Sequence, residues 1–287
     1  MSTHPPVSVI IVTWNSEGDI VRCLQSLSIE QGLIGEVVLF DNASTDGTIK
    51  LVEEQFPQVR VVRNRENPGY AVAVNQGLRE VSSELVLLLN PDAWMKEEGL
   101  RPLVDYLQKH PEAGACAPRL LFPDGRFQPS CRRFPTLARL LVEAAGLWFI
   151  FPFLSRWRWK LSEKEHCEGP VDQPMTSVFL LTRRVIDRVG SFDESFPIFF
   201  NDVDFCRRVW NGGFPIAHVP QARWLHRLGG ATGQKKFRMT FLSHQSLFRY
   251  LWRSATLGGR LGLVFLWPVF WLLLFPRLSA AVFVQDD

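Results

Sequence analysis

The sequence lacks the features that mark several common classes of protein. Its net charge is only +3, so we do not expect nucleic acid as a partner. It has no GxGxxG or GxxxxGK[ST] motif, so a dinucleotide-binding turn and a P-loop are not expected. Its five cysteines have no CxxC spacing, which argues against a zinc site or a disulfide framework and is typical of a reduced, cytosolic chain. These cysteines are Cys23, Cys116, Cys131, Cys167 and Cys206.

The sequence also lacks an apolar run long enough for a secure transmembrane helix. The runs at 144–160 and 261–276 fall short of the roughly 18 to 20 apolar residues that such a helix needs. Trp and Arg residues beside them suit a membrane interface, so we expect shallow membrane contact. Two core helices, or a carboxyl-terminal end that does span the membrane, remain as alternatives. The first six residues are too short and polar for a signal peptide, which favours a cytoplasmic amino-terminal domain.

What the chain does contain is a regular alternation of strand-like and helix-like segments. With 287 residues, 46% hydrophobic and 21% charged, it is long enough for a large folded domain. Apolar runs predict strands at 7–14, 36–40, 59–64 and 84–90. Helices are predicted at about 17–28, before Pro57 and at 70–81. This order predicts an α/β fold, with a mostly parallel sheet flanked by helices.

Polar residues follow the end of each predicted strand. They are Thr13 and Asn15; Asp41, Asn42, Ser44 and Asp46; Asn64, Asn67 and Gly69; and Asn90 and Asp92. One such cluster alone is usually a turn or a helix cap. Four of them at the carboxyl edge of one sheet predict a ligand site, because ligands bind there in open α/β sheets. Asp41 is suited to accept a hydrogen bond from a base or a ribose, and Asp92 is suited to hold a divalent cation.

A second acidic motif lies in the other half of the chain. The segment 196–208 reads FPIFFNDVDFCRR, which places Asp202 and Asp204 directly after a run of apolar residues. Acids are common in the first turn of a helix, so a plain helix cap is one interpretation. The other interpretation is a general base whose apolar surroundings keep its pKa from being too low.

Several motifs together resemble a known family. They are VSVIIVTWNSEGDIVRCLQSL (7–27), DNASTDGT (41–48), NPGYAVAVNQGL (67–78), LLLNPDA (87–93), the segment 190–213 around NDVD, and HVPQARWLHRLGGAT (218–232). Their order resembles that of inverting, family-two glycosyltransferases of the GT-A fold, and in particular the bacterial rhamnosyltransferase-like branch. The resemblance covers roughly residues 7 to 235. It implies a nucleotide-diphosphate sugar donor, a divalent metal (Mg²⁺ or Mn²⁺) and a single displacement at the anomeric carbon.

The resemblance also assigns roles to individual residues. It implies that Asp202 is the catalytic base, with Asp204 as a possible second acid. The metal ligands would be Asp92, at the last Asp of the DxD motif, and His226. The resemblance implies that Asp41 holds a pyrimidine and that Asp46 supports the nucleotide loop. The full set implied for the nucleotide sugar is Thr13, Asn15, Asp41, Asn42, Asp46, Asn67, Gly69, Asn75 and Asn90.

Three positions depart from the family pattern. Asn90 stands where DxD has its first acid, which predicts a weaker metal site with one carboxylate. Asn201 stands where relatives usually have Glu, and we expect this to remove a charge from the acceptor pocket. The segment MTSVFLL (175–181) lacks the usual GA at its start, so the donor pocket is expected to differ in detail.

The predicted organisation is a GT-A domain at 1–235 and a helical, membrane-associating segment at 236–287. Within the domain, 7–118 would bind the nucleotide sugar, and 119–235 the acceptor, with an apolar insert at about 137–160. The resemblance implies a dTDP- or UDP-linked donor, with dTDP-rhamnose favoured, and a glycan or polyprenyl-linked acceptor. The protein is expected at the cytoplasmic face of the inner membrane, where it would take part in the synthesis of cell-envelope polysaccharide.

Two other hypotheses compete with this one. A sugar nucleotidyltransferase also begins with such a sheet, but it should show a glycine-rich loop with Arg and Lys after the first strand, unlike TWNSEGD (13–19). A non-catalytic relative that binds a nucleotide sugar or a glycan is suggested by Asn90 and Asn201. A product assay separates this alternative from an enzyme.

Overall fold

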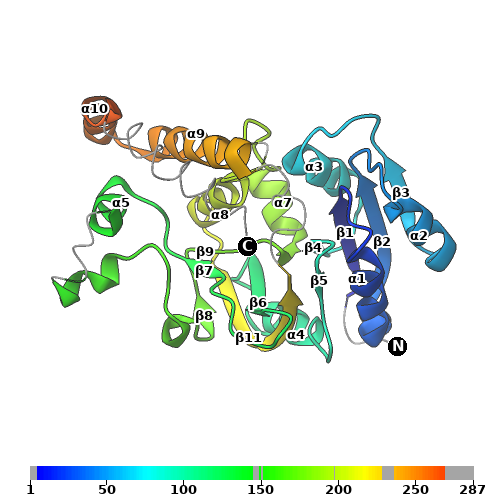
Figure 1. Ribbon diagram of the computed structural model, residues 1–287. Helices are drawn as coiled ribbons and strands as arrows, with labels where there is room; N and C mark the ends of the chain where they lie inside the picture. The colour runs from blue at the N-terminus through cyan, green and yellow to red at the C-terminus, as the bar shows by residue number, and fades with distance from the viewer. Residues whose placement is uncertain (1–4, 145–148, 150, 197, 228–235, 269–287) are drawn as a thin grey trace.

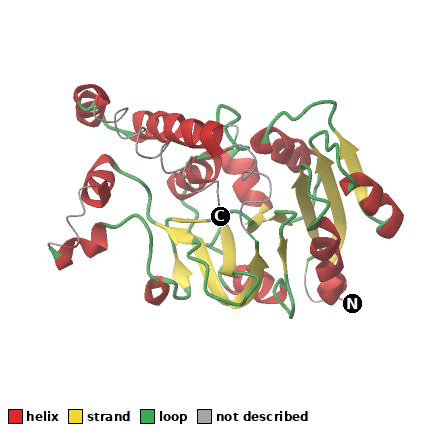
Figure 2. Cartoon of the chain, viewed as in Figure 1, coloured by secondary structure: helices red, strands yellow, loops and turns green. Residues whose placement is uncertain are grey.

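The computed structural model describes residues 5–144, 149, 151–196, 198–227 and 236–268 (Figure 1). In these residues the main sheet has nine strands, with helices packed on both faces (Figure 2). The end of the predicted carboxyl-terminal apolar segment, 269–287, lies outside the described residues, as does 228–235.

The amino-terminal part of the sheet is parallel, as the sequence predicts. Its strands are β1 (Val7–Thr13), β2 (Ile34–Asp41), β3 (Arg60–Arg63) and β4 (Leu85–Leu89), in the order β3-β2-β1-β4. Between them run α1 (Ile20–Leu27), a 3₁₀ turn η1 (Ser28–Leu33), α2 (Thr48–Gln55) and α3 (Tyr70–Glu80). Every residue of β1 and β4 is buried, because helices cover both faces of these strands.

The second part of the sheet is mixed. It contains β5 (Ala93–Trp94), β6 (Ala115–Leu121), β8 (Gly169–Pro170), β10 (Val178–Thr182) and β11 (Ile216–His226). Strand β10 lies antiparallel between β4 and β6, and β11 is parallel to β6 but antiparallel to β5 and β8. The α/β fold is therefore confirmed, and its parallel character is concentrated in the first four strands. A small second sheet pairs β7 (Cys131–Arg132) with β9 (Gln173–Pro174).

The remaining helices cover the sheet and extend beyond it. They are α4 (Arg101–Lys109), α5 (Leu137–Ala144), η2 (Pro152–Trp157), η3 (Glu163–Glu165), α7 (Arg183–Val189), α8 (Asn201–Asn211), α9 (Lys236–Ser254) and α10 (Leu257–Phe265). In Figure 1, α9 lies along α8, and α5 and α10 lie at the end of the molecule far from β3.

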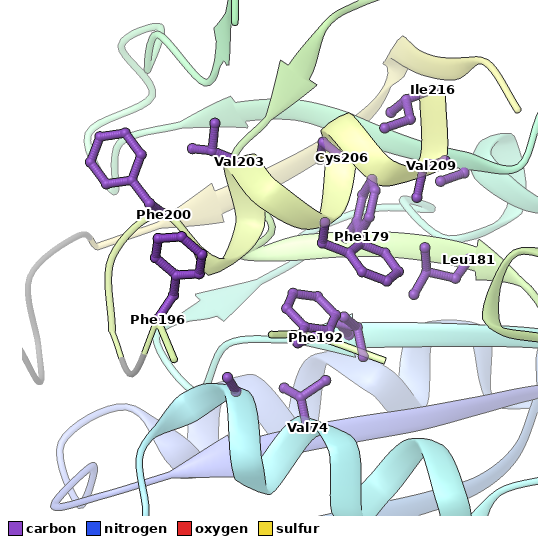
Figure 3. Packing of buried hydrophobic residues seen from close by; sticks show 14 of the residues in the cluster. Val74, Phe179, Leu181, Phe192, Phe196, Phe200, Val203, Cys206, Val209 and Ile216 are labelled. Carbon is purple, nitrogen blue, oxygen red and sulfur yellow. The ribbon is translucent and has the colours of Figure 1, made fainter. Parts of the chain in front are cut away.

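Alternate side chains of the strands form two cores, one on each face of the sheet. Ile10, Phe40 and Leu88 pack with α3 and α8, whereas Ile11, Leu39 and Leu87 pack with α1, α2 and α4. Figure 3 shows the first core around Phe192. The rings of Phe192 and Phe205 stack in this core, with centroids 4.2 Å apart. Each fully buried side chain of this size contributes about 1.5–3 kcal/mol, so the two cores hold the strand ends of the sheet in place.

The apolar runs expected at a membrane interface are exposed where the structure describes them. Phe149 and Phe151 before η2, Phe153 in η2, and Leu261, Val264 and Phe265 on α10 are exposed. Only Leu263 of the described α10 residues is buried, so α10 is not a core helix. Nowhere in the described ranges is a helix both long enough and apolar enough to cross a membrane.

Candidate active site

The loop after β2 is organised around Asp41 and Asn15. The Asp41 carboxylate accepts hydrogen bonds from the backbone N–H of Ser44 at 3.2 Å and from its hydroxyl at 2.5 Å. Asn15 Oδ1 accepts from the N–H of Thr45 at 2.8 Å, and the N–H of Asn15 donates to Ser44 Oγ. Asn15 and Ala43 have left-handed backbone with φ of 49° and 60°. The loops after β1 and β2 thus hold each other in a strained, defined shape.

Asp46 fixes the start of α2. Its carboxylate accepts from the Thr48 hydroxyl at 2.5 Å and from the backbone N–H of Glu17 at 3.1 Å. Burial disfavours the charge, but these hydrogen bonds outweigh it and hold the pKa of Asp46 below its usual value. Its bonds lie within the protein, in agreement with the supporting role that the resemblance implies.

The loops after β1, β2 and β3 meet at one edge of the sheet, as predicted. The Asn42 amide donates to the carbonyl of Gly69 at 3.4 Å, and Asn67 Oδ1 accepts from the N–H of Gly69 at 3.0 Å. Gly69 has a φ of +94°, which favours glycine at this turn into α3. Thr13 Oγ1 is buried here and has no hydrogen-bond partner within the described ranges.

Asn75 is brought to a different place from the other predicted nucleotide-sugar ligands. Its side chain is 1% exposed, and its amide donates to the carbonyl of Phe192 and to Glu194, each at 2.9 Å. Its Oδ1 accepts from the N–H of Phe192 at 2.8 Å. These bonds tie α3 to the segment that leads towards Asp202, so the structure gives Asn75 a structural function.

Asp92 and His226 meet at the pairing of β5 and β11. His226 Nε2 lies 3.3 Å from Asp92 Oδ1, and His226 Nδ1 lies 2.8 Å from Oε1 of Gln128. Because an amide oxygen only accepts, Nδ1 donates to Gln128, and this hydrogen bond directs Nε2 towards Asp92. Gln128 was not among the predicted site residues, because nothing in its sequence context signals that it orients a histidine.

The side chains of Asp92 and His226 suit a divalent cation that also binds a ligand. Asn90 donates to Ser177 Oγ at 3.3 Å, and its N–H donates to the Ser177 carbonyl at 2.8 Å, so Asn90 anchors β4 to β10. In the part of the chain that the structure describes, no three His, Cys, Asp or Glu side chains are grouped so that they could hold a metal ion. One carboxylate and one imidazole fit a divalent ion that takes its other ligands from a diphosphate and water.

The structure adds Asp19 to this end of the site. Asp19 is 4% exposed, and its Oδ2 lies 2.6 Å from Nη2 of Arg227. Burial raises the pKa of Asp19 and Asp92 adds to this, while Arg227 opposes it. The backbone N–H of Arg227 also donates to the carbonyl of Asp92 at 3.0 Å. The sequence places Asp19 in a predicted helix and does not mark it as a site residue. Only its burial in the structure identifies it as a candidate.

Asp202 lies in the first turn of α8 with a partly exposed side chain. Burial raises the pKa of Asp202, against the hydrogen bond from the N–H of Val203 and the positive charge of Arg132. Asp204, the possible second acid, instead pairs with Arg208 at 2.8 Å. A carboxyl with a raised pKa is better suited to accept a proton than an ordinary one.

Asn201 is buried at the start of α8. Its side chain is 2% exposed, and its amide donates to the backbone carbonyls of Phe196 at 3.3 Å and Ile198 at 3.0 Å. Its amide therefore holds the loop before α8, a contact that the sequence did not predict. The preceding Phe200 has left-handed backbone with φ of 67°, which Asn201 helps to hold.

Two consecutive residues, Thr176 and Ser177, connect the surroundings of Asp202 with those of Asp92. Tyr70 hydrogen-bonds with Thr176, and the pKa of this tyrosine is raised mainly by burial, to which the charge of Asp202 adds. Ser177 in turn bonds to Asn90, two residues before Asp92. The contacts of Tyr70 and of Asn90 therefore fall on consecutive residues just before β10.

Comparison with known proteins identifies the family. Residues 8–187 match glycosyl transferase family 2. The chain belongs to this family. This glycosyltransferase is 30% identical over 280 residues to N-acetylglucosaminyl-diphospho-decaprenol L-rhamnosyltransferase of Mycobacterium tuberculosis (strain ATCC 25618 / H37Rv), covering 89% of this chain and 90% of the relative. It is 25% identical over 265 residues to rhamnosyltransferase WbbL of Escherichia coli (strain K12), covering 88% and 96%. The resemblance to rhamnosyltransferases is thus confirmed.

Solved structures agree on the fold of the glycosyltransferase. Mannosyltransferase PcManGT from Pyrobaculum calidifontis, in complex with GDP-Man and Mn²⁺, aligns with a TM-score of 0.60 at 20% identity, covering 99% of this chain and 75% of that one. GalNAc-T7 with UDP, GalNAc and Mn²⁺ aligns with a TM-score of 0.60 at 18% identity, covering 79% and 44%. At this level of identity the likeness shows the GT-A fold alone.

Proposed function

We propose that this glycosyltransferase transfers a sugar, with L-rhamnose from dTDP-rhamnose as the leading candidate, to a lipid-linked glycan acceptor with inversion at the anomeric carbon. The observation that carries the proposal is the pairing of Asp92 with His226 at the carboxyl edge of the sheet, and the raised pKa of Asp202 in the first turn of α8 supports it. The rhamnosyltransferase relatives named above support the choice of sugar and acceptor.

Asp202 acts as the general base in this proposal. An acceptor hydroxyl oxygen attacks the anomeric carbon, the bond from that carbon to the diphosphate oxygen breaks, and the hydroxyl proton passes to the Asp202 carboxylate. The products are the glycosylated acceptor and a nucleoside diphosphate. Burial raises the pKa of Asp202, so its carboxylate binds the hydroxyl proton more tightly than an ordinary aspartate as the acceptor attacks.

The opposite end of the site binds the donor. Asp41 and Asn15 shape the loop that would hold the nucleoside, and Asp92 and His226 would hold a divalent cation. When bound, Mg²⁺ or Mn²⁺ supplies charge stabilisation to a departing diphosphate. Arg227, held by Asp19 beside Asp92, adds a cationic side chain at the same end. In this proposal residues 7–118 supply most of the donor contacts, and His226 and Arg227 of the 119–235 half contribute at the cation-binding end.

The exposed apolar side chains support contact with a membrane surface. An apolar hollow of about 590 Å³ lies between α9 and α10 and is lined by Phe248, Arg249, Trp252, Val264, Trp267 and Pro268. Together with the exposed phenylalanines around η2, it suits the interface between lipid headgroups and acyl chains. We therefore propose that the enzyme works at the cytoplasmic face of the inner membrane, where a lipid-linked acceptor is found.

A panel assay tests the proposal. Membranes that contain the protein are incubated with dTDP-rhamnose, other dTDP-sugars, UDP-sugars and GDP-mannose, and the consumed donor and the glycosylated lipid are identified. We expect one pyrimidine donor to be consumed together with the acceptor. Consumption of GDP-mannose alone would overturn the proposed donor, and binding of a nucleotide sugar without any product would favour a non-catalytic relative.

A further inference from the structure

Arg132 lies in β7 of the second sheet, and its guanidinium has hydrogen-bonding capacity that the described residues do not use. Its guanidinium lies over the ring of Trp159, with 5.1 Å between Cζ and the ring centroid. Its Nε is buried and has no hydrogen-bond partner among the residues that the structure describes. Within the same residues it forms no ion pair, although its positive charge acts on Asp202 and lowers the pKa of that carboxyl against the larger effect of burial.

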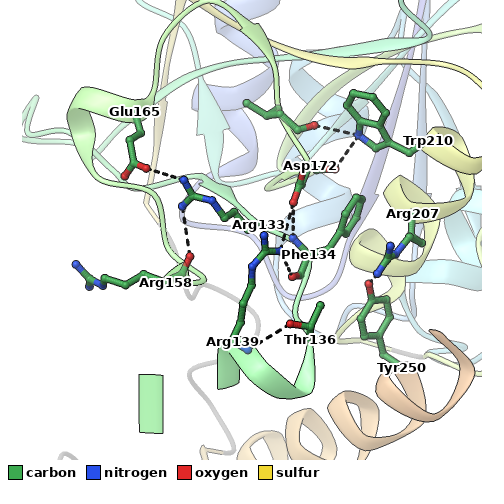
Figure 4. A network of polar contacts seen from close by, with 11 residues as sticks. Arg133, Phe134, Thr136, Arg139, Arg158, Glu165, Asp172, Arg207, Trp210 and Tyr250 are labelled. Atoms are coloured by element: carbon green, nitrogen blue, oxygen red, sulfur yellow. Dashed lines mark hydrogen bonds and ion pairs between the residues drawn. The ribbon is translucent and has the colours of Figure 1, made fainter. Parts of the chain in front are cut away.

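The neighbouring arginines Arg133, Arg139 and Arg207 have polar partners for their guanidinium groups, whereas Nε of Arg132 has none among the described residues. Figure 4 shows Arg133 bonded to Glu165 at 2.7 Å, Arg139 3.8 Å from the Asp172 carboxylate, and Arg207 beside Tyr250. A buried guanidinium N–H without an acceptor is unfavourable, unless a ligand supplies the acceptor oxygen.

The surroundings hold Arg132 in a defined position. The backbone N–H of the adjacent Cys131 donates to Nε2 of His166 at 2.9 Å, and Cys131 pairs with Pro174 across the second sheet. Trp159, which lies against Arg132, stacks with Phe200 at 6.5 Å between centroids, two residues before Asp202. Trp159 Nε1 is a second buried donor that has no partner within the described ranges. Two donors without acceptors therefore lie side by side next to the proposed base.

We propose that Arg132 and Trp159 form an acceptor subsite that binds a phosphate group of the acceptor while Asp202 receives the proton from its hydroxyl. The planar guanidinium matches a phosphate with two parallel hydrogen bonds, and stacking on Trp159 fixes the plane in which it presents them. This inference rests on the proposed function, and it specifies that the acceptor sugar carries phosphate. A relative whose name includes a diphospho-decaprenol acceptor agrees with this chemistry.

The test compares phosphate and neutral acceptors on three proteins: wild type, Arg132→Gln and the matched control Arg133→Gln. The acceptors are N-acetylglucosamine diphospho-lipid and a neutral N-acetylglucosamine alkyl glycoside of equal chain length. For Arg132→Gln we expect KM for the phosphate acceptor to rise about ten- to a hundredfold, the loss typical of a charge-assisted hydrogen bond. KM for the donor and for the neutral acceptor should stay within about twofold. Arg132→Lys should recover part of the loss, and Arg133→Gln should show none.

Two results would overturn the inference. One is an equal loss for both acceptors, which would mean that Arg132 acts only through Asp202. The other is a rise in donor KM, which would place Arg132 at the donor diphosphate. Thermal unfolding of each variant shows whether a loss reflects misfolding.

A binding measurement keeps this inference separate from the proposed function. Calorimetry measures binding of N-acetylglucosamine 1-phosphate and of N-acetylglucosamine, and it does not depend on sugar transfer. It also shows whether a soluble sugar phosphate binds in place of the lipid-linked form used above. Binding of the phosphate form that is lost in Arg132→Gln would uphold the subsite even if no donor is turned over. Equal binding by wild type and Arg132→Gln, in a protein that does transfer sugar, would overturn the subsite alone.

Discussion

Nε2 of His226 lies 3.3 Å from Oδ1 of Asp92, where the last residue of β11 meets the start of β5. Removal of divalent metal with EDTA should therefore abolish transfer, and Mn²⁺ should restore it. Asp92→Asn should raise the Mn²⁺ concentration needed for half-maximal activity by at least about tenfold, because the amide lacks the charge that binds the ion. Asp124→Asn, in an exposed turn, serves as the control. Full activity in EDTA would contradict the assignment.

Gln128→Leu should weaken metal binding at this site without changing the proposed metal ligands, Asp92 and His226. Oε1 of Gln128 accepts a hydrogen bond from Nδ1–H of His226 and so keeps Nε2 directed at Asp92. Loss of such an orienting partner typically lowers metal affinity about 10- to 100-fold. The measurement is a Mn²⁺ titration of the transfer rate. An unchanged titration would mean that His226 is held by its other contacts.

Asp202→Asn should lower the transfer rate about 10²- to 10⁴-fold, the usual contribution of a general base. Donor affinity, measured by calorimetry with the nucleotide diphosphate, should stay the same. In the wild type the rate should fall on the acid side as Asp202 becomes protonated, and the raised pKa places this fall above the pH of an ordinary aspartate. Asp204→Asn should keep most activity, since Asp204 pairs with Arg208. A greater loss in Asp204→Asn would reverse the two roles.

Asn75→Ala should destabilise the fold by about 2–4 kcal/mol, because the buried N–H and carbonyl of Phe192 both lose their partner. Urea unfolding measures this loss. Gln55→Ala, at the exposed end of α2, should change stability by less than about 0.5 kcal/mol. A stable Asn75→Ala protein with weakened donor binding would restore the ligand role that the resemblance implies.

His218 should make stability depend on pH. Burial lowers its pKa to about 4, whereas an unfolded histidine titrates near about 6.5. The unfolded chain therefore binds more protons between these values, so stability is full above pH about 6.5 and falls as the pH drops towards 4. Thermal unfolding across this range checks the slope. His218→Gln should reduce the slope, and what remains should come partly from His166, whose pKa burial also lowers.

The sequence by itself determined the order of strands and helices in the amino-terminal half and the strand-end residues that gather at one edge. Hydrophobic periodicity is a local property, and parallel strands bring their carboxyl ends together whatever the details of packing. Asp41, Asn42, Asn67 and Gly69 accordingly meet where the pattern predicts.

Only the tertiary structure decided which polar side chains face the site. Asn75 and Asn201 belong to the same motifs as the predicted ligands, yet burial turns their amides towards backbone carbonyls. Asp19, Gln128 and Arg132 acquire their importance from partners far along the chain, or from having none among the described residues. Such relationships arise from packing between distant segments, and no local pattern of residues encodes them.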